Sequence, residues 1–306
     1  MQPDSTIRLL RREALDENRW QACIDKAANG LIYGQHYYLD ASTENWWALV
    51  AGDYETVMPL TWRKKNLFSY LFQPLWCQQL GLFSSEPINA ALSAAFVRKA
   101  KEYFSFGEIC LNYGNPLPGS RHRNNYTLDL NRNYATISKQ YNENLGRNLK
   151  KAAERELRYD QSIAYADSID FFRANYEHRI NSKENDWLTL NAICQTLQQR
   201  NQLLVRAAIA DNQVVGSCLV LRDNKRLYLL VIATNEKGKT VSASHFIIDQ
   251  LIQEFQSQPL LLDFEGSDLP GIERFYGGFG ASNQPYFFYG WNQLPIPFRW
   301  WKPRYL

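Results

Sequence analysis

Two carboxylates and a phenol, Asp263, Glu265 and Tyr276, are the side chains of this 306-residue chain whose types and spacing suggest chemistry. Asp263 interrupts the apolar residues 260–264, a run of strand length, and Glu265 follows it directly. Buried strands usually exclude such groups, because an unpaired charge is costly away from water. The two carboxylates therefore need either a buried partner or a function.

The residues after Glu265 predict a turn and then a short helix. Asp268 is a favourable N-cap, and Pro270 fits the first helical turn. The pair Gly277-Gly278 is expected to end the helix, which places Tyr276 in its last turn. Residues 284–289 are aromatic and are predicted to form the last strand.

This corner resembles the last β–α–β unit of the GNAT (N-acetyltransferase) superfamily. The resemblance lies in the order Tyr276, two variable residues, Phe279, Gly280 and Ala281. The lead-in at residues 263–267, DFEGS, is similar to the FemAB-like branch, whose chains carry two GNAT domains in tandem.

The resemblance implies an α/β (α+β) fold with two tandem GNAT-like domains, each a mixed, largely antiparallel sheet flanked by helices. Residues 1–133 are expected to form an N-terminal domain without the phosphate loop or the Tyr-to-Gly pattern, and therefore a degenerate one. Residues 134–306 are expected to form the C-terminal domain with the ligand site. A long charged helix is predicted over residues 137–159, at the start of the second domain.

The same resemblance implies roles for the site residues. Amide formation needs a neutral amine, a polarised carbonyl and a protonated leaving thiolate. Glu265 is the candidate base, with its pKa raised by burial, and Tyr276 the candidate acid. Asp263 accompanies them. The backbone N–H groups of Val231 and Ala233 would polarise the thioester.

Acyl-CoA is the co-substrate that the family implies, and a helix N-terminus is a natural site for its diphosphate. Here the segment that precedes this helix is expected to be a loop with only one glycine. Charges and hydroxyls would then replace the usual paired glycines. The candidate binding residues in this segment are Lys237, Gly238, Lys239, Ser242 and Ser244.

Each of these assignments has a structural alternative. Asp263 or Glu265 would pair with Arg274 or cap the Asp268 helix, and Tyr276 would only pack. The segment around Gly238 would be a plain surface loop. His245 lies on the helix after this segment and could face the ligand, but an ordinary residue on a helix surface is the expectation.

Composition restricts the remaining classes of function. The net charge of +3 argues little by itself, because nucleic-acid binders need a concentrated basic face, and no DNA partner is expected. Five scattered cysteines without C-x-x-C spacing favour reduced thiols in the cytoplasm, and no metal site is expected. The first residues do not contain the apolar segment of a signal peptide. No apolar run approaches the roughly 18–20 residues of a membrane-spanning helix.

The predicted function is therefore transfer of an acyl group from acyl-CoA to an amine of a small molecule or cell-envelope precursor. Fem-type transfer from aminoacyl-tRNA to a peptidoglycan peptide is the alternative, and tRNA would then be a partner. A non-catalytic binding protein that retains the fold is the other alternative. The tail at residues 295–306, PIPFRWWKPRYL, is expected to pack on its own domain or to contact a membrane surface.

Overall fold

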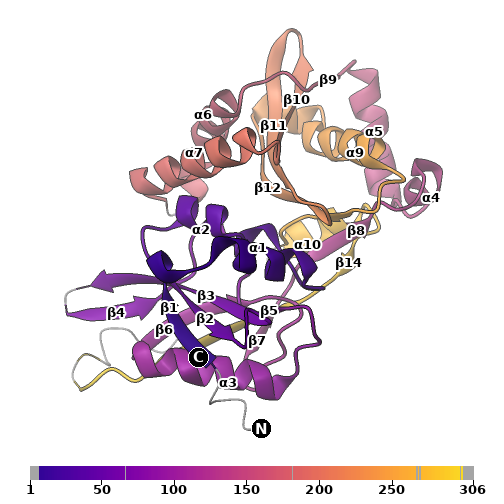
Figure 1. Ribbon diagram of the computed structural model, residues 1–306. Coiled ribbons are helices and arrows are strands. Elements are labelled where there is room, and N and C mark those ends of the chain that lie inside the picture. The colour runs from indigo at the N-terminus through magenta and orange to yellow at the C-terminus, as the bar shows by residue number, and fades with distance from the viewer. Residues whose placement is uncertain are drawn as a thin grey trace. The chain divides into compact units, whose positions relative to one another are not determined.

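The computed structural model describes residues 7–65, 67–180, 182–266, 268, 270–296 and 298, and it divides into two compact units (Figure 1). Unit 1 consists of Met1–Arg123 together with Pro285–Leu306. Unit 2 is the continuous segment Asn124–Gln284. Each unit has its own sheet and its own buried core.

The sheet of unit 1 has the order β1-β2-β3-β4-β6-β15-β7, and β5 pairs with β3 outside this path. All its pairs are antiparallel except β4 with β6. Its strands are β1 (Ile7–Arg11), β2 (Trp46–Ala51), β3 (Thr56–Lys65), β4 (Phe68–Leu71), β5 (Phe83–Ser84), β6 (Phe106–Leu111), β7 (Arg121–Arg123) and β15 (Tyr286–Asn292).

Helices cover both faces of the unit 1 sheet. Asn89 caps α3, because its side chain accepts a hydrogen bond from Leu92 N at 2.9 Å. The apolar face of α3 packs on a core that includes Leu49, Leu60 and Leu111. The helices are α1 (Glu17–Lys26), α2 (His36–Ser42) and α3 (Ala90–Tyr103), with 3-10 turns η2 (Arg12–Ala14) and η3 (Ile32–Gly34).

The sheet of unit 2 has the order β14-β8-β13-β12-β11-β10-β9. Only β12 and β13 pair in parallel. Its strands are β8 (Tyr126–Asp129), β9 (Arg158–Asp160), β10 (Leu203–Ala210), β11 (Gln213–Arg222), β12 (Arg226–Thr234), β13 (Leu261–Asp263) and β14 (Ser282–Asn283).

Helices α6 and α7 lie on one face of this sheet, and α5 and α9 lie on the other (Figure 1). Strand β11 is therefore buried on both faces, which explains its almost uninterrupted apolar sequence. The helices are α4 (Tyr134–Ser138), α5 (Glu143–Glu154), α6 (Tyr165–Tyr176), η4 (Glu177–Arg179), α7 (Glu184–Gln199), α8 (Glu236–Thr240), α9 (Ala243–Phe255) and α10 (Pro270–Gly277).

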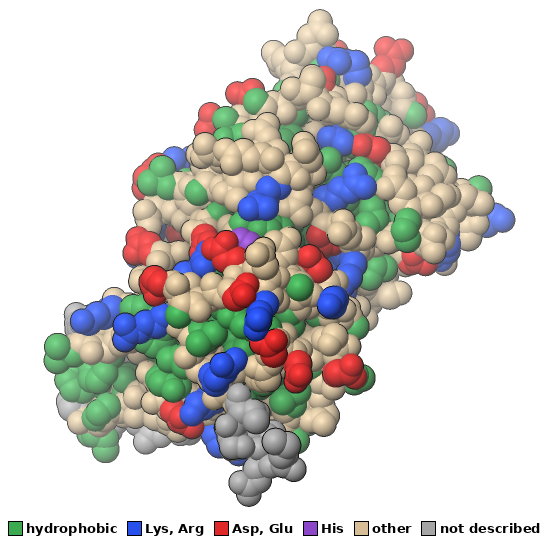
Figure 2. Space-filling model, in the orientation of Figure 1, with side chains coloured by type: hydrophobic (Ala, Val, Ile, Leu, Met, Phe, Trp, Pro, Cys, Tyr) green, Lys and Arg blue, Asp and Glu red, His purple; other side chains and the backbone are tan. Residues whose placement is uncertain are grey.

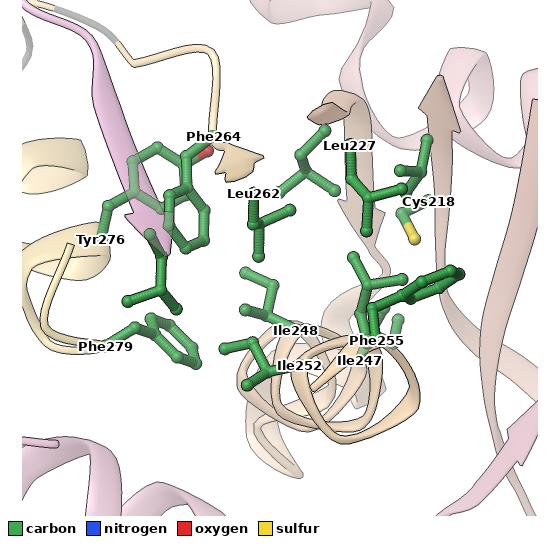
Figure 3. Close-up of a cluster of buried hydrophobic side chains, with 14 of the residues drawn as sticks. Cys218, Leu227, Ile247, Ile248, Ile252, Phe255, Leu262, Phe264, Tyr276 and Phe279 are labelled. Carbon is green, nitrogen blue, oxygen red and sulfur yellow. The ribbon is translucent and has the colours of Figure 1, made fainter. Parts of the chain in front are cut away.

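The core of unit 2 lies between α9 and the sheet (Figure 3). Ile248 and Ile252 of α9 face Leu262 of β13. At one end of the same core, Phe264 and Tyr276 lie side by side. The predicted catalytic corner is thus built on the rigid core of unit 2.

The fold class is confirmed, because each unit contains a mixed, largely antiparallel sheet flanked by helices. The predicted division at residues 133 and 134 differs from the observed units at two places. Strand β8 belongs to unit 2, where it pairs with β13. Strand β15, which was expected to complete the second domain, lies between β6 and β7 of unit 1. Local pattern predicts a strand but does not specify the sheet that it joins.

Two local predictions were wrong. The single helix expected over residues 137–159 is divided into α4, α5 and the strand β9, with Asn142 capping α5 through Leu145 N at 2.8 Å. The loop expected over residues 235–239 contains the short helix α8, whose N-cap Asn235 accepts a hydrogen bond from Gly238 N at 2.8 Å.

Of the tail at residues 295–306, only Pro295, Ile296 and Phe298 are among the described residues, so the expectations for its tryptophans lie outside them. No helix in the described ranges is long and apolar enough to cross a membrane.

Candidate functional site

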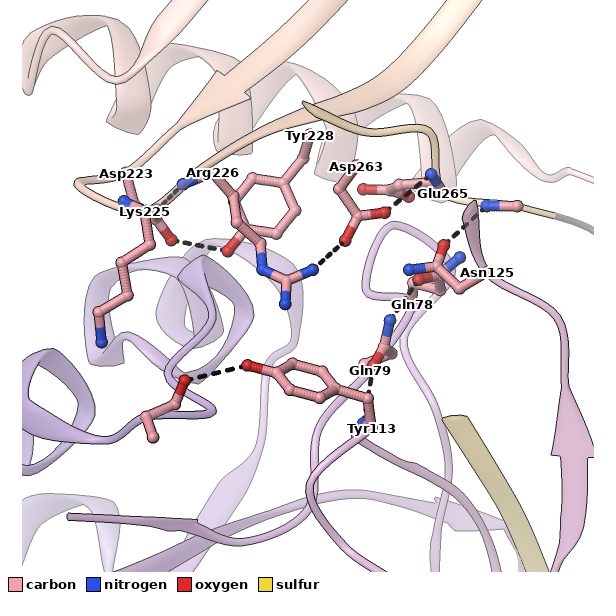
Figure 4. Close-up of polar contacts among 12 residues, drawn as sticks. Gln78, Gln79, Tyr113, Asn125, Asp223, Lys225, Arg226, Tyr228, Asp263 and Glu265 are labelled. Atoms are coloured by element: carbon pink, nitrogen blue, oxygen red, sulfur yellow. Dashed lines mark hydrogen bonds and ion pairs between the residues drawn. The ribbon is translucent and has the colours of Figure 1, made fainter. Parts of the chain in front are cut away.

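The corner that follows β13 is built on a buried ion pair (Figure 4). Arg226, at the start of β12, points toward Asp263, at the end of β13, and the distance between Nη1 and Oδ2 is 2.8 Å. Both side chains are almost fully buried. The predicted alternative partner, Arg274, is exposed and does not fill this role. Asp263 is thus neutralised inside the fold and is a positioning residue for the corner.

Backbone hydrogen bonds fix the loop that carries Glu265. Asp263 Oδ1 accepts one from Glu265 N at 3.1 Å, and Asn125 Oδ1 accepts one from Gly266 N at 2.9 Å. A Cβ on Gly266 would lie 2.8 Å from the Tyr126 ring and 3.0 Å from Asn125 Cα. Only glycine therefore fits where the loop crosses the start of β8.

Glu265 has an unusual backbone and an unusual charge state. Its φ is +50°, in the left-handed region that non-glycine residues seldom adopt. Such strain tends to occur where the surrounding structure serves a function. Burial raises the pKa of its carboxyl from 4.5 to about 8. This agrees with the expectation that burial brings the group toward the range of a base at neutral pH.

Tyr276 lies next to this corner in the last turn of α10. Its ring stacks on Phe264 with 4.6 Å between centroids and an angle of 29°. It is buried, and burial raises the pKa of its phenol, with the negative charges of Glu265 and Asp263 adding to the effect. The phenol therefore holds its proton and is suited to donate a hydrogen bond to a developing negative charge.

One edge of β12 is open beyond the corner. The parallel pairing with β13 ends at Tyr228 and Asp263, and no strand in the described ranges pairs with that edge farther along. The pairing with β11 on the other edge is irregular between Leu229 and Val231, which indicates a β-bulge at Leu230. The predicted residues Val231 and Ala233 follow this bulge, and both are buried.

The predicted lysines are already engaged. Lys237 Nζ lies 2.7 Å from Asp211 Oδ2, and Lys239 pairs with Glu236. Gly238 is buried where a Cβ would lie 1.9 Å from Val215 O, so its role is close packing of α8 on β11. These lysines would reach a phosphate only by exchanging their surface partners, each worth about 1 kcal/mol or less.

The start of α9 provides donors of another kind. Ser242 has a φ of +60°, and its hydroxyl donates to Asn148 Oδ1 at 2.8 Å, so its side chain does not cap the helix. The N–H groups of Ala243, Ser244 and His245 have no acceptor within the described part of the chain. Backbone N–H groups at a helix N-terminus can hold a diphosphate.

His245 connects this helix start to α10. Its ring lies 4.7 Å from that of Phe275 and 6.4 Å from that of Phe279, and burial lowers its pKa to about 4. The expectation of an ordinary helix-surface histidine was therefore wrong. Neutral His245 packs between the two helices.

Three positions that support the site were not predicted. Arg226 neutralises Asp263, Asn125 holds the loop, and Asn148 binds Ser242. Of these three, Arg226 could have been sought from the sequence. Asp263 lies within an apolar strand, and a buried carboxylate needs a cation close by. Among the described residues, no group of three His, Cys, Asp or Glu side chains is arranged to hold a metal ion.

Part of this chain matches a known protein family in sequence, and nearly all of it is similar in fold to solved structures. Residues 139–271 match the family described as acetyltransferase (GNAT) domain. No curated protein sequence matches the chain. The fold is similar to that of FemX, at 11% identity and a TM-score of 0.64, over 94% of this chain and 98% of that one.

Two other solved structures share the fold over nearly the whole length. A tandem GNAT protein from the clavulanic acid biosynthesis pathway is 9% identical, with a TM-score of 0.53 over 94% of this chain and 99% of that one. The C-terminal domain of a candidate lysylphosphatidylglycerol synthetase from Agrobacterium fabrum is 10% identical, with a TM-score of 0.55 over 93% of each chain. The predicted resemblance to GNAT proteins is confirmed over residues 139–271. The likeness to FemX and to a tandem GNAT protein shows that the fold of nearly the whole chain agrees with the predicted FemAB-like arrangement.

Proposed function

We propose that unit 2, which contains the GNAT acetyltransferase domain of this chain, transfers an acyl group from acyl-CoA to an amine of a small molecule or cell-envelope precursor. The observation that carries this proposal is the open edge of β12 beside Glu265. A backbone edge can hold an extended acyl donor, and a carboxyl with a pKa of about 8 suits proton removal from an amine.

In the proposed reaction the amine nitrogen attacks the thioester carbonyl carbon, a C–N bond forms and the C–S bond breaks. Glu265 accepts the proton that the nitrogen loses. The N–H groups of β12 beyond its bulge polarise the carbonyl oxygen. Tyr276 donates a hydrogen bond to the leaving sulfur, which takes a proton from solvent while Glu265 releases the proton it accepted. The net result is movement of one proton from nitrogen to sulfur.

The start of α9 is the proposed diphosphate site. Its three N–H donors suit phosphate oxygens, whereas Lys237 and Lys239 are paired with carboxylates. Binding is therefore expected to depend on the helix N-terminus more than on the lysines. Neutralising Lys237 alone should weaken acyl-CoA binding only a few-fold, since an exposed charge contributes about 1 kcal/mol or less.

The engaged lysines also favour a second candidate function. A donor other than acyl-CoA, such as an aminoacyl-tRNA used in the Fem-type reaction, would not require a Gly-rich phosphate loop. The similarity to FemX in fold accords with this alternative. A binding protein without catalysis would likewise tolerate the short helix α8 in place of that loop.

Thermal unfolding with acetyl-CoA, together with release of free CoA thiol in the presence of amines, tests the main proposal. Saturable stabilisation is expected from binding to the native state. Tyr276→Phe removes only the hydroxyl and should reduce thiol release roughly ten- to a thousand-fold without changing stabilisation by the ligand. Absence of stabilisation at millimolar acetyl-CoA would contradict the proposed donor.

A further inference from the structure

The β3–β4 hairpin of unit 1 presents an apolar residue to solvent at its tip. β3 ends at Lys65 and β4 begins at Phe68, so only two residues connect the strands. Leu67, in this turn, is 85% exposed, whereas most large apolar side chains among the described residues are buried or partly buried. Figure 2 shows hydrophobic side chains gathered at the end of unit 1 that carries β4, with Lys and Arg side chains beside them.

A second segment of unit 1 extends the same surface. The Phe298 ring lies 5.1 Å from the Phe68 ring, at an angle of 60°. Ile296, two residues before Phe298, is 77% exposed. Leu67, Phe68, Ile296 and Phe298 thus form an apolar patch from two parts of the chain, which we call the hairpin patch.

The two segments that contribute to the hairpin patch have charges of one sign in their sequences. Arg63, Lys64 and Lys65 are exposed, and Lys64 and Lys65 make no ion pair within the described residues. Residues 56–85 and 285–306 each contain three Lys or Arg and no Asp or Glu. Because the whole chain has a net charge of +3, the remaining residues have a net charge of −3.

We propose that the hairpin patch binds the surface of an anionic lipid bilayer. Apolar side chains at a protruding turn can enter the boundary between headgroups and acyl chains, while neighbouring cations bind anionic headgroups. A folded protein partner would gain little from the few apolar side chains at the end of a narrow hairpin. The positive segments, by contrast, match the negative surface potential of a membrane. The proposal does not depend on the acyl transfer proposed for unit 2.

Flotation of the full chain with lipid vesicles tests this proposal. Binding is expected to vesicles that contain phosphatidylserine and to be weak with phosphatidylcholine alone, and added salt should reduce it. Leu67→Ser should weaken binding about tenfold. Lys64→Gln combined with Lys65→Gln should weaken it roughly thirtyfold, since each surface charge contributes separately.

Leu188→Ser is the matched control, because Leu188 is 60% exposed on α7 of unit 2, outside the hairpin patch. This variant should bind vesicles like the unchanged chain, and all variants should melt at the same temperature. Equal binding to neutral vesicles, or unchanged binding by both hairpin variants, would overturn the proposal. Light scattering provides a further test. If the unsubstituted chain is a dimer and Leu67→Ser is a monomer, the patch is an interface between copies and the proposal is overturned.

Discussion

At Glu265, an unusual backbone and a raised pKa have one local cause. Asp263 and Asn125 accept backbone hydrogen bonds from Glu265 and Gly266, and these hold the loop in which the φ of Glu265 is left-handed and its side chain is partly buried. Arg226 is engaged by Asp263 at 2.8 Å. Burial then disfavours the ionised form of Glu265, which is the condition for a base that works near neutral pH.

We expect Glu265→Gln to reduce turnover roughly a hundred- to ten-thousand-fold while KM changes little, because it removes a base and almost no shape. In the chain without this substitution, only the ionised Glu265 carboxylate can accept the proton. The rate should therefore rise with pH and level off above about 8. Steady-state rates across this range provide the measurement. Unchanged turnover with a lower melting temperature would show that Glu265 is structural.

The same carboxyl should make stability depend on pH. Its folded pKa of about 8 exceeds its ordinary value of 4.5, so its contribution to stability is present below 4.5 and is lost as pH rises through 8. The free energy of unfolding in urea should therefore fall between about pH 5 and about pH 8 for the chain with Glu265, relative to that of Glu265→Gln at the same pH values. No difference between the two pH values would contradict the raised pKa.

Arg226→Met should destabilise unit 2 by about 3–5 kcal/mol, because it leaves the buried Asp263 carboxylate without its cation. Adding Asp263→Asn should recover part of that loss. Arg173→Met is the control, since Arg173 pairs with Glu184 at the surface and should contribute about 1 kcal/mol or less. Chemical unfolding of the three variants measures the difference. Equal effects of Arg226→Met and Arg173→Met would argue against a buried pair.

At the scale of elements, two glycines near the site should respond in opposite ways. Gly266→Ala places a Cβ 3.0 Å from the backbone of Asn125 and should cost about 1–3 kcal/mol. Gly271, in the first turn of α10, has no neighbour within 4 Å of such a Cβ. Gly271→Ala should therefore be neutral or stabilise by up to about 1 kcal/mol. Thermal unfolding of both variants checks this, and equal melting temperatures would indicate that the loop can move away from β8.

The elements that sequence predicted correctly at the site are those whose signals are local. The run that ends at Asp263, and the glycine pair that ends α10, specify their own strand and helix. The partner Arg226 lies 37 residues earlier, and its contact depends on the parallel register of β12 and β13. Asn125 is still more distant in sequence. Sheet register and long-range contacts are not contained in a local pattern.

At the scale of the whole molecule, the chain passes between its units twice, after Arg123 and after Gln284. The sheet of unit 1 is therefore completed only when the last strand of the chain is present. In unit 2, the strand β8 occupies the corresponding place beside β13. This exchange is why a division of the sequence at a single boundary could not reproduce the two units.

A chain that ends at Gln284 should lose the structure of unit 1 around β6 and retain that of unit 2. β15 lies between β6 and β7, so its removal breaks backbone pairing on both edges. It also removes Trp291, whose Nε1 donates to Phe104 O at 2.7 Å and whose ring covers Gly107. Loss of one buried tryptophan costs about 3–5 kcal/mol, a large part of the roughly 5–15 kcal/mol that stabilises a domain.

Hydrogen exchange measures this difference strand by strand. Amides of β6 should become unprotected in the shortened chain, while those of β11 in unit 2 keep their protection. A chain that ends at Phe298 is the matched control, because it retains all of β15 and should protect β6 fully. Protection of β6 in the chain that ends at Gln284 would show that unit 1 folds without its last strand. Loss of protection in β11 as well would show that unit 2 depends on unit 1, contrary to its continuous segment and separate core.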